Sequence, residues 1–160
     1  MQKITPCLWF DDKAEEAAHF YVSVFKNSKI TGLSRYGEGA HRPKGTVMVV
    51  TFELDGEKFM ALNGGPLFTF SEAISFVVKC ATQPEVDHFW DKLSAGGKPG
   101  RCGWLKDKYG VSWQIVPTAF EEMMKEGDAA QSERVMKALL QMDKLDIEGL
   151  RKAYRQAEGA

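Results

Sequence analysis

The order of the predicted secondary-structure elements repeats along the chain, and this repeat limits the possible folds more than any other feature. Each half contains a strand, an amphipathic helix and then further strands. The segment Ala18-His19-Phe20-Tyr21 in the first predicted helix also matches Asp87-His88-Phe89-Trp90 in the second, about 70 residues later. Four residues can match by accident, so the shared order of elements carries the argument. It predicts two βαβββ modules in an α+β fold.

The first module is predicted to cover residues 1–66. The acidic pair Asp11-Asp12 favours the start of a helix, and Asp55-Gly56 is a strong signal for a tight hairpin turn. Asn63-Gly64-Gly65-Pro66 cannot continue a central strand or a helix, so it ends the module. The expected strands are 1–10, 30–36, 46–54 and 57–62, and the expected helix is 14–25.

The second module is predicted over residues 67–117, with a strand over 73–80 and a helix over 84–94. A glycine-rich break at Gly96-Gly97 then leads to short strands around 102–105 and 111–116. Between these two strands, Lys106-Asp107 is expected to serve the turn that ends at Gly110.

A helical tail is predicted over residues 118–160, with Thr118 as a helix cap. The expected helices are 119–125, 129–142 and 146–156. The middle of the tail has a broad apolar face, made of Val135, Met136, Leu139, Leu140 and Met142. This face must cover either the sheets of the same chain or a second subunit, and we expect a second subunit.

The length and charge of the chain exclude several classes of protein. With 160 residues, the chain fits one compact domain. Its 21 Lys and Arg residues nearly balance its 22 Asp and Glu residues, so neither nucleic acid nor a membrane surface is an expected partner. The three cysteines, Cys7, Cys80 and Cys102, show no pairing pattern and indicate reduced thiols. No segment has the pattern of a membrane span or signal peptide, so we expect a cytoplasmic protein.

Five segments carry a resemblance to a known family. The longest runs from Cys102 to Pro117 (CGWLKDKYGVSWQIVP) and is long enough to be specific. The others are Ile4–Phe10, Glu16–Phe25, Phe59–Pro66 and Met142–Ile147. Together they resemble the PhnB-like family of the glyoxalase/bleomycin-resistance (vicinal oxygen chelate) superfamily, whose members often carry a demethylubiquinone methyltransferase label.

The resemblance implies paired modules whose curved mixed sheets enclose a cleft, commonly in a homodimer. In metal-using relatives, His, Glu or Gln ligands project from the first and last strands of each module. The corresponding positions of this chain are Thr5, Phe59 or Met60, Ala73 and Gln114. Transition metals in such sites need several imidazole or carboxylate ligands. We therefore expect neither a metal ion nor another cofactor.

Six residues are predicted to bind a ligand in the cleft: Thr5, Cys7, Trp9, Asn63, Trp104 and Gln114. Strand alternation places Thr5, Cys7 and Trp9 on one face of the first strand. The same rule places Gln114 on a cleft face and turns Trp113 toward the covering helix. The Gln114 amide then either orients a ligand or bonds to a neighbouring backbone group or to the Thr5 hydroxyl.

The histidines and cysteines are weaker candidates. His19 and His88 occupy equivalent helix positions that point away from a sheet-lined cleft, so we expect surface or packing roles for both. His41 lies in a glycine-rich loop and is expected to be solvated. No His or Lys adjacent in sequence announces an activated thiolate at Cys7 or Cys102.

Three functions are compatible with these features. A bound S-adenosylmethionine usually needs a glycine-rich turn directly between a strand and a helix, and neither Gly64-Gly65 nor Gly96-Gly97 is in such a place. The first hypothesis is therefore a small-molecule-binding protein with an apolar cleft and an unidentified ligand. The others are a metal-independent enzyme in which Thr5, Asn63 and Gln114 position a substrate, and a dimeric interaction module with a vestigial cleft.

Overall fold

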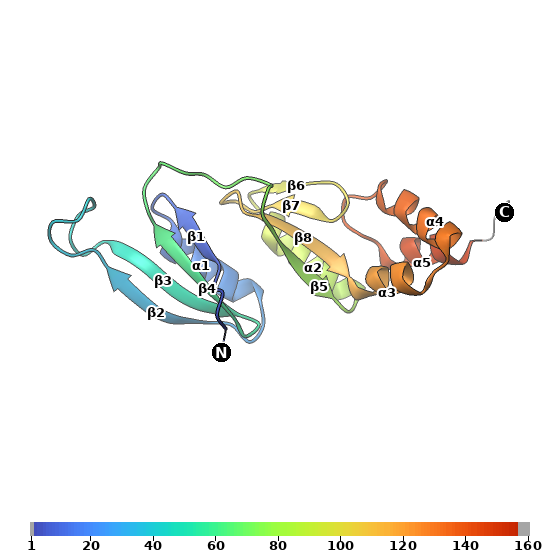
Figure 1. Ribbon diagram of the computed structural model, residues 1–160, viewed down its shortest axis with the longest axis horizontal. Helices are drawn as coiled ribbons and strands as arrows, with labels where there is room; N and C mark the ends of the chain where they lie inside the picture. The colour runs from blue at the N-terminus through green and yellow to red at the C-terminus, as the bar shows by residue number, and fades with distance from the viewer. Residues whose placement is uncertain (1, 157–160) are drawn as a thin grey trace. The chain divides into compact units, whose positions relative to one another are not determined.

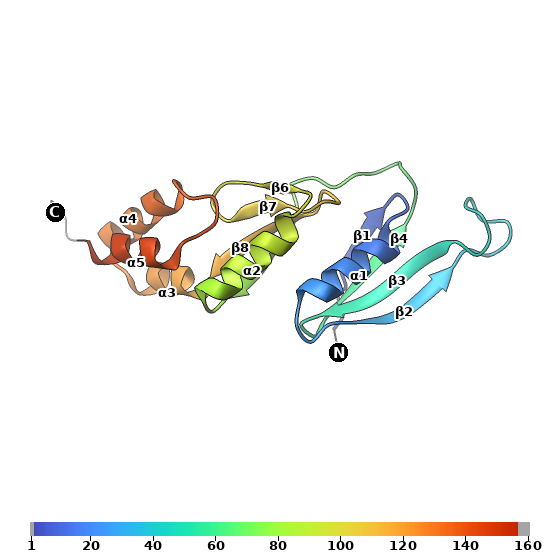
Figure 2. The same ribbon diagram turned by 180° about the vertical axis from the view of Figure 1, so that it is seen from behind.

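The computed structural model describes residues 2–156, and the chain divides into two compact units, Met1–Phe70 and Ser71–Ala160. Each unit contains a four-stranded mixed sheet with a helix against one face (Figures 1 and 2). The predicted α+β class with two βαβββ modules is confirmed, and the helical tail belongs to the second unit. The single compact domain stays a prediction.

The first unit follows the predicted order. Its elements are β1 (Cys7–Phe10), α1 (Ala14–Val24), β2 (Lys29–Arg35), β3 (Val47–Leu54) and β4 (Glu57–Asn63). The sheet order is β1-β4-β3-β2, with β1 parallel to β4 and the other neighbours antiparallel. Asp55 and Gly56 form the predicted β3–β4 turn with φ angles of 49° and 81°, the left-handed conformation that a two-residue hairpin requires.

Alternate residues of the first sheet face α1. Val50, Phe52 and Leu54 of β3 are buried, whereas Thr51 and Glu53 between them point to the opposite face. The buried residues of α1 are Ala14, Ala17, Ala18, Tyr21 and Val24. The core of this unit therefore lies on one face of its sheet.

The second unit repeats the arrangement. Its elements are β5 (Ser75–Cys80), α2 (Gln83–Ser94), β6 (Lys98–Pro99), β7 (Trp104–Lys106) and β8 (Ser112–Pro117), and the sheet order is β5-β8-β7-β6. The Thr82 hydroxyl caps α2 by accepting a hydrogen bond from the Glu85 N–H at 3.3 Å. The sequence does not reveal β6, because two residues carry no alternation pattern.

Helix α2 covers one face of the second sheet, as Figure 2 shows. Val86, Trp90 and Leu93 are its buried residues, and Trp113 and Ile115 are buried on β8. This burial confirms that Trp113 faces the helix. Gln114, which lies between Trp113 and Ile115, is therefore turned to the other face of the sheet.

The tail forms α3 (Thr118–Glu126), α4 (Ala129–Leu139) and α5 (Ile147–Arg155). Thr118 begins α3 instead of capping it, because Pro117 occupies the cap position. Asp128 caps α4 in a capping box with Gln131. No helix described between residues 2 and 156 has the length and apolar character needed to cross a membrane.

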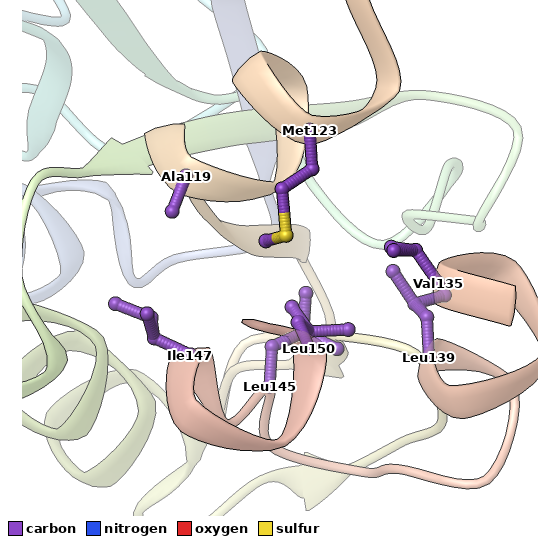
Figure 3. Packing of buried hydrophobic residues seen from close by; sticks show 7 residues of the cluster. All are labelled: Ala119, Met123, Val135, Leu139, Leu145, Ile147 and Leu150. Carbon is purple, nitrogen blue, oxygen red and sulfur yellow. The ribbon is translucent and has the colours of Figure 1, made fainter. Parts of the chain in front are cut away.

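The tail covers its own apolar face. Val135 and Leu139 of α4 form a buried cluster with Leu150 of α5, and both Val135 and Leu150 are 0% exposed. Figure 3 shows this tail cluster, which consists of Ala119, Met123, Val135, Leu139, Leu145, Ile147 and Leu150. The expectation that a second subunit covers this face is therefore wrong for Val135 and Leu139. Leu140 of the predicted face is 52% exposed.

The loop between α4 and α5 attaches the tail cluster to the second sheet. The Cys102 and Gly103 N–H groups donate to the backbone carbonyls of Met142 and Asp143, each at 2.8 Å. Gly103 has a φ of 85°, and a Cβ there would lie 2.9 Å from the Ile115 carbonyl oxygen. A glycine is therefore required where the tail meets the sheet.

Leu150→Ala is expected to lower the free energy of unfolding by about 2–5 kcal/mol, because it removes a fully buried side chain from the tail cluster. Leu140→Ala, at an exposed position of the same tail, should change it by less than about 0.5 kcal/mol. Denaturant unfolding of both variants measures the difference. Equal effects would contradict the described packing.

Candidate ligand-binding site

Each unit has a sheet face turned away from its helix. In the first unit this face carries Cys7 and Trp9 of β1 and Met60 of β4. In the second it carries Gln114 of β8 and Trp104 of β7, which are paired in the ladder. These surfaces are called the first and the second open face below. Each is partly exposed, so each offers side chains to a ligand.

The first open face contains a hollow of about 340 Å³. Its lining residues are Thr5, Thr31, Thr51, Phe52, Glu53, Lys58, Phe59 and Met60. The Thr31 hydroxyl donates to the Thr51 hydroxyl oxygen at 2.9 Å. The volume lies at the small end of the range for small-molecule pockets. Thr5 therefore lines a space in which hydroxyl groups lie beside the Met60 thioether.

Cys7 lies on the first open face and is exposed. Partial burial raises the pKa of its thiol above the usual value, since the surroundings disfavour the charged thiolate. A raised pKa lowers the thiolate fraction at neutral pH, and the thiolate is the nucleophilic form. The position of Cys7 therefore favours ligand contact rather than nucleophilic catalysis.

Trp9 lies against the glycine turn that follows β4. Its indole N–H donates to the Gly65 carbonyl oxygen at 2.9 Å, and its ring meets Phe68 edge-on at 5.0 Å between centroids. A Cβ at Gly64 would lie 2.4 Å from the Trp9 ring. Gly64 therefore permits close packing of the indole, and Trp9 offers an aromatic wall rather than a hydrogen-bond donor.

Asn63 is not on an open face. It is 6% exposed and lies on the α1 side of β4. Its Oδ1 accepts from the Ala14 N–H at 2.8 Å, and its Nδ2 donates to the Val47 carbonyl at 3.1 Å. The first bond satisfies an N–H of the first turn of α1, whose own N-cap residue, Lys13, makes no cap bond, and the second ties the amide to β3. The amide predicted to bind a ligand thus has a structural role.

Gln114 and Trp104 lie side by side on the second open face. The Gln114 Nε2 donates to the Ser75 hydroxyl at 2.9 Å, so its partner is a hydroxyl of the neighbouring strand β5. This bond fixes the amide and leaves its oxygen able to accept from a ligand. Ser75 was not among the residues predicted to bind a ligand. Strand alternation could have found it, because Ser75 lies two residues after Ala73, a position that the resemblance places at the cleft.

Ser112 is a further residue of the second open face. It is 1% exposed, and its Oγ has no hydrogen-bond partner within residues 2–156. An unpaired buried hydroxyl destabilises a fold by about 1–3 kcal/mol, so its presence needs a reason. Its ladder partner on β7 is Lys106, which forms an ion pair with Glu72.

Lys106 and Asp107, both predicted to serve the turn after β7, have different roles in the structure. Asp107 is buried, and its Oδ1 accepts from the N–H groups of Tyr109 and Val111 at 2.8 and 3.1 Å. Its Oδ2 accepts from the Trp113 indole at 2.9 Å. The turn function is confirmed for Asp107, whereas Lys106 extends over the open face.

The three histidines lie at the surface. His19 and His88 are exposed on α1 and α2, as predicted, and His41 is exposed in the β2–β3 loop. The His41 ring meets Tyr36 edge-on at 5.3 Å between centroids. Among residues 2–156, no group of three or more His, Cys, Asp or Glu side chains is arranged to hold a metal ion.

The positions that hold metal ligands in the superfamily do not fit a transition metal in this chain. The side chains there are a hydroxyl at Thr5, a thioether at Met60 and an amide at Gln114, while Ala73 precedes β5 and is exposed. Neutral donors of this kind compete poorly with water for divalent transition metals.

The strand-to-helix connections do not fit a nucleotide-type methyl donor. Residues 11–13 connect β1 to α1, and residues 81–82 connect β5 to α2, both without glycine. Gly64-Gly65 follows β4, and Gly96-Gly97 follows α2. Neither pair can present the N–H groups of a helix start to a phosphate or carboxylate.

Comparison with known proteins decides the family. The model of the 3-demethylubiquinone-9 3-methyltransferase family matches residues 2–116. The PhnB protein from Bacillus cereus is 43% identical, with a TM-score of 0.66, over 72% of this chain and 99% of that chain. This chain belongs to that family. The PhnB-like resemblance read from the sequence is confirmed, and helices α3–α5 lie beyond the matched segment of the 3-demethylubiquinone-9 3-methyltransferase family.

Two less similar structures were also found. Protein PA1353 from Pseudomonas aeruginosa is 17% identical with a TM-score of 0.62, over 73% of this chain and 98% of that chain, and it shares the fold. A glyoxalase/bleomycin resistance protein from Albidiferax ferrireducens is 12% identical with a TM-score of 0.48, over 72% and 98% of the two chains. No curated protein matches the chain. The homodimer and the enclosed cleft stay predictions.

Asn63→Ala is expected to lower the free energy of unfolding by about 1–3 kcal/mol, because it leaves the Ala14 N–H and the Val47 carbonyl unpaired. Gln141→Ala, at an exposed position, is the control and should have little effect. Thermal and denaturant unfolding provide the measurement. An unchanged stability would show that the described role of Asn63 is wrong.

Proposed function

We propose that this chain is a cytoplasmic protein that binds a small organic molecule on its open sheet faces, by packing and neutral hydrogen bonds, without a metal ion or cofactor. The observation that supports this proposal is the chemistry of the open faces. On the first open face the Thr5 hydroxyl lines the same hollow as Met60, and on the second the Gln114 amide, bonded to Ser75, lies beside Trp104.

Such a surface binds a ligand through two kinds of contact, apolar contacts and hydrogen bonds. Apolar contact contributes roughly 25 cal/mol per Å² of surface removed from water, so Met60 on the first open face, or Trp104 on the second, supplies most of the affinity. Hydroxyl and amide groups fix the orientation of the ligand, because a polar ligand group left unpaired against them loses its bonds to water. The mixture fits a ligand with an apolar body and a few polar atoms.

The methyl transfer named in the family description is not carried over to this chain. That reaction requires a methyl donor, and the strand-to-helix connections at residues 11–13 and 81–82 do not provide the usual site for one. Turnover of a bound molecule would instead make the chain a metal-independent enzyme. Binding is the function that the two open faces support most directly.

The variant Thr5→Val/Gln114→Leu removes one polar group from each open face, and it is expected to weaken binding of the best ligand from a metabolite screen by about tenfold, as the ligand loses a hydrogen bond on the face that holds it. The screen measures the ligand-induced rise in melting temperature, and titration calorimetry then gives the dissociation constants. Thr69→Val/Gln141→Leu, at two exposed positions outside the open faces, is the matched control. An unchanged affinity in the first variant would remove Thr5 and Gln114 from the site.

Removal of metal ions is expected to leave ligand binding unchanged, because the open faces offer no imidazole or carboxylate set for a transition metal. Elemental analysis of the purified protein should show less than stoichiometric Zn, Ni, Mn and Fe. Calorimetric titration before and after treatment with a chelator measures the affinity. A stoichiometric metal, or a loss of binding after chelation, would contradict the metal-free proposal.

A further inference from the structure

An ion pair on the second open face lies close in the strand register to a buried serine. In the sheet order β5-β8-β7-β6, strand β8 lies between β5 and β7. Glu72 precedes β5 and Lys106 belongs to β7, yet their side chains form an ion pair. The pair therefore links the chain segments on the two sides of β8, whose first residue, Ser112, is the ladder partner of both Ser75 and Lys106.

Ser112 is buried next to Lys106 in the ladder. The serine is 1% exposed on a face that no helix of its module covers, and its Oγ is without a partner in residues 2–156. The Glu72 side chain, which pairs with Lys106, is 61% exposed and belongs to no strand, so it can move away from Lys106 without breaking a ladder bond. Lys106 is held by β7 and is 38% exposed.

We propose that the Ser112 hydroxyl and the Lys106 ammonium group form an anion subsite, which binds the carboxylate of a small organic acid in place of the Glu72 carboxylate. This inference deepens the proposed function and rests on it. A carboxylate offers two acceptor oxygens, one for each donor. The Trp104 ring and the Gln114 amide, on the same face, suit a flat apolar body next to the carboxylate.

Glu72 acts as an internal competitor for this subsite. Its hydrogen bond with Lys106 and the charge of Lys106 lower the pKa of its carboxyl group below the usual value. Glu72 is therefore ionised at neutral pH, and an incoming carboxylate must displace it. Removal of the Glu72 charge should strengthen anion binding, whereas removal of the Lys106 charge should weaken it.

The experiment compares two probes, 1-naphthoate and its neutral amide, by calorimetric titration of the full chain. The wild type is expected to bind 1-naphthoate about tenfold more tightly than 1-naphthamide, since a charge-assisted hydrogen bond exceeds a neutral one. Lys106→Gln should abolish this preference. Glu72→Gln should tighten 1-naphthoate binding several-fold and leave 1-naphthamide binding unchanged, a result that a purely structural ion pair would not give.

Two further variants complete the test. Ser112→Ala should weaken 1-naphthoate binding without loss of stability, because the Oγ that it removes has no partner in the described chain. Lys79→Gln removes the lysine of another ion pair in the same unit, with Glu121 at 3.5 Å, and should change neither affinity.

Equal affinity of the wild type for the two probes would overturn the proposal of an anion subsite. Affinities that stay the same in Lys106→Gln and Glu72→Gln would also overturn it. Binding of the neutral amide in that case would leave the proposed function standing. Binding of neither probe would also overturn the subsite, and the proposed function would then be decided by the metabolite screen.

Discussion

Packing of one helix against one face of each sheet is the constraint on which the rest of the structure depends. In the first unit the alternation of β3 buries Val50, Phe52 and Leu54 under α1, and in the second Trp113 and Ile115 lie under α2. Strand geometry then turns the intervening residues to the other side. The core does not require a particular side chain at those positions, so the side chains there are available to bind a ligand.

The open faces combine two kinds of polar chemistry. Neutral groups, such as Thr5 and the bonded pair Ser75 and Gln114, can orient a ligand without drawing in a metal ion. The Lys106 and Glu72 pair adds a charge that a ligand can take over. Membership of the 3-demethylubiquinone-9 3-methyltransferase family therefore defines the fold, whereas the residues on the open faces define the chemistry of the proposed site.

Local sequence patterns predicted much of this structure, but they could not predict contacts between segments that are distant in the sequence. Alternation placed Trp113 correctly, and Asp55-Gly56 marked its turn, because each signal lies within one strand or hairpin. The role of Asn63 depends on a helix start 49 residues away, which no local pattern reveals. The pairing of Ser112 with Lys106 depends on strand order, and the tail cluster depends on loops that return α5 to α4.

The central claim is that the open faces hold an organic ligand without a metal ion. Nuclear Overhauser contacts between a bound ligand and the side chains of the protein, recorded in the presence of a chelator, test this claim most directly. The account predicts contacts to the Met60 methyl group or to the Trp104 indole ring. Contacts confined to α1 and α2, or complete loss of the bound state on chelation, would contradict it.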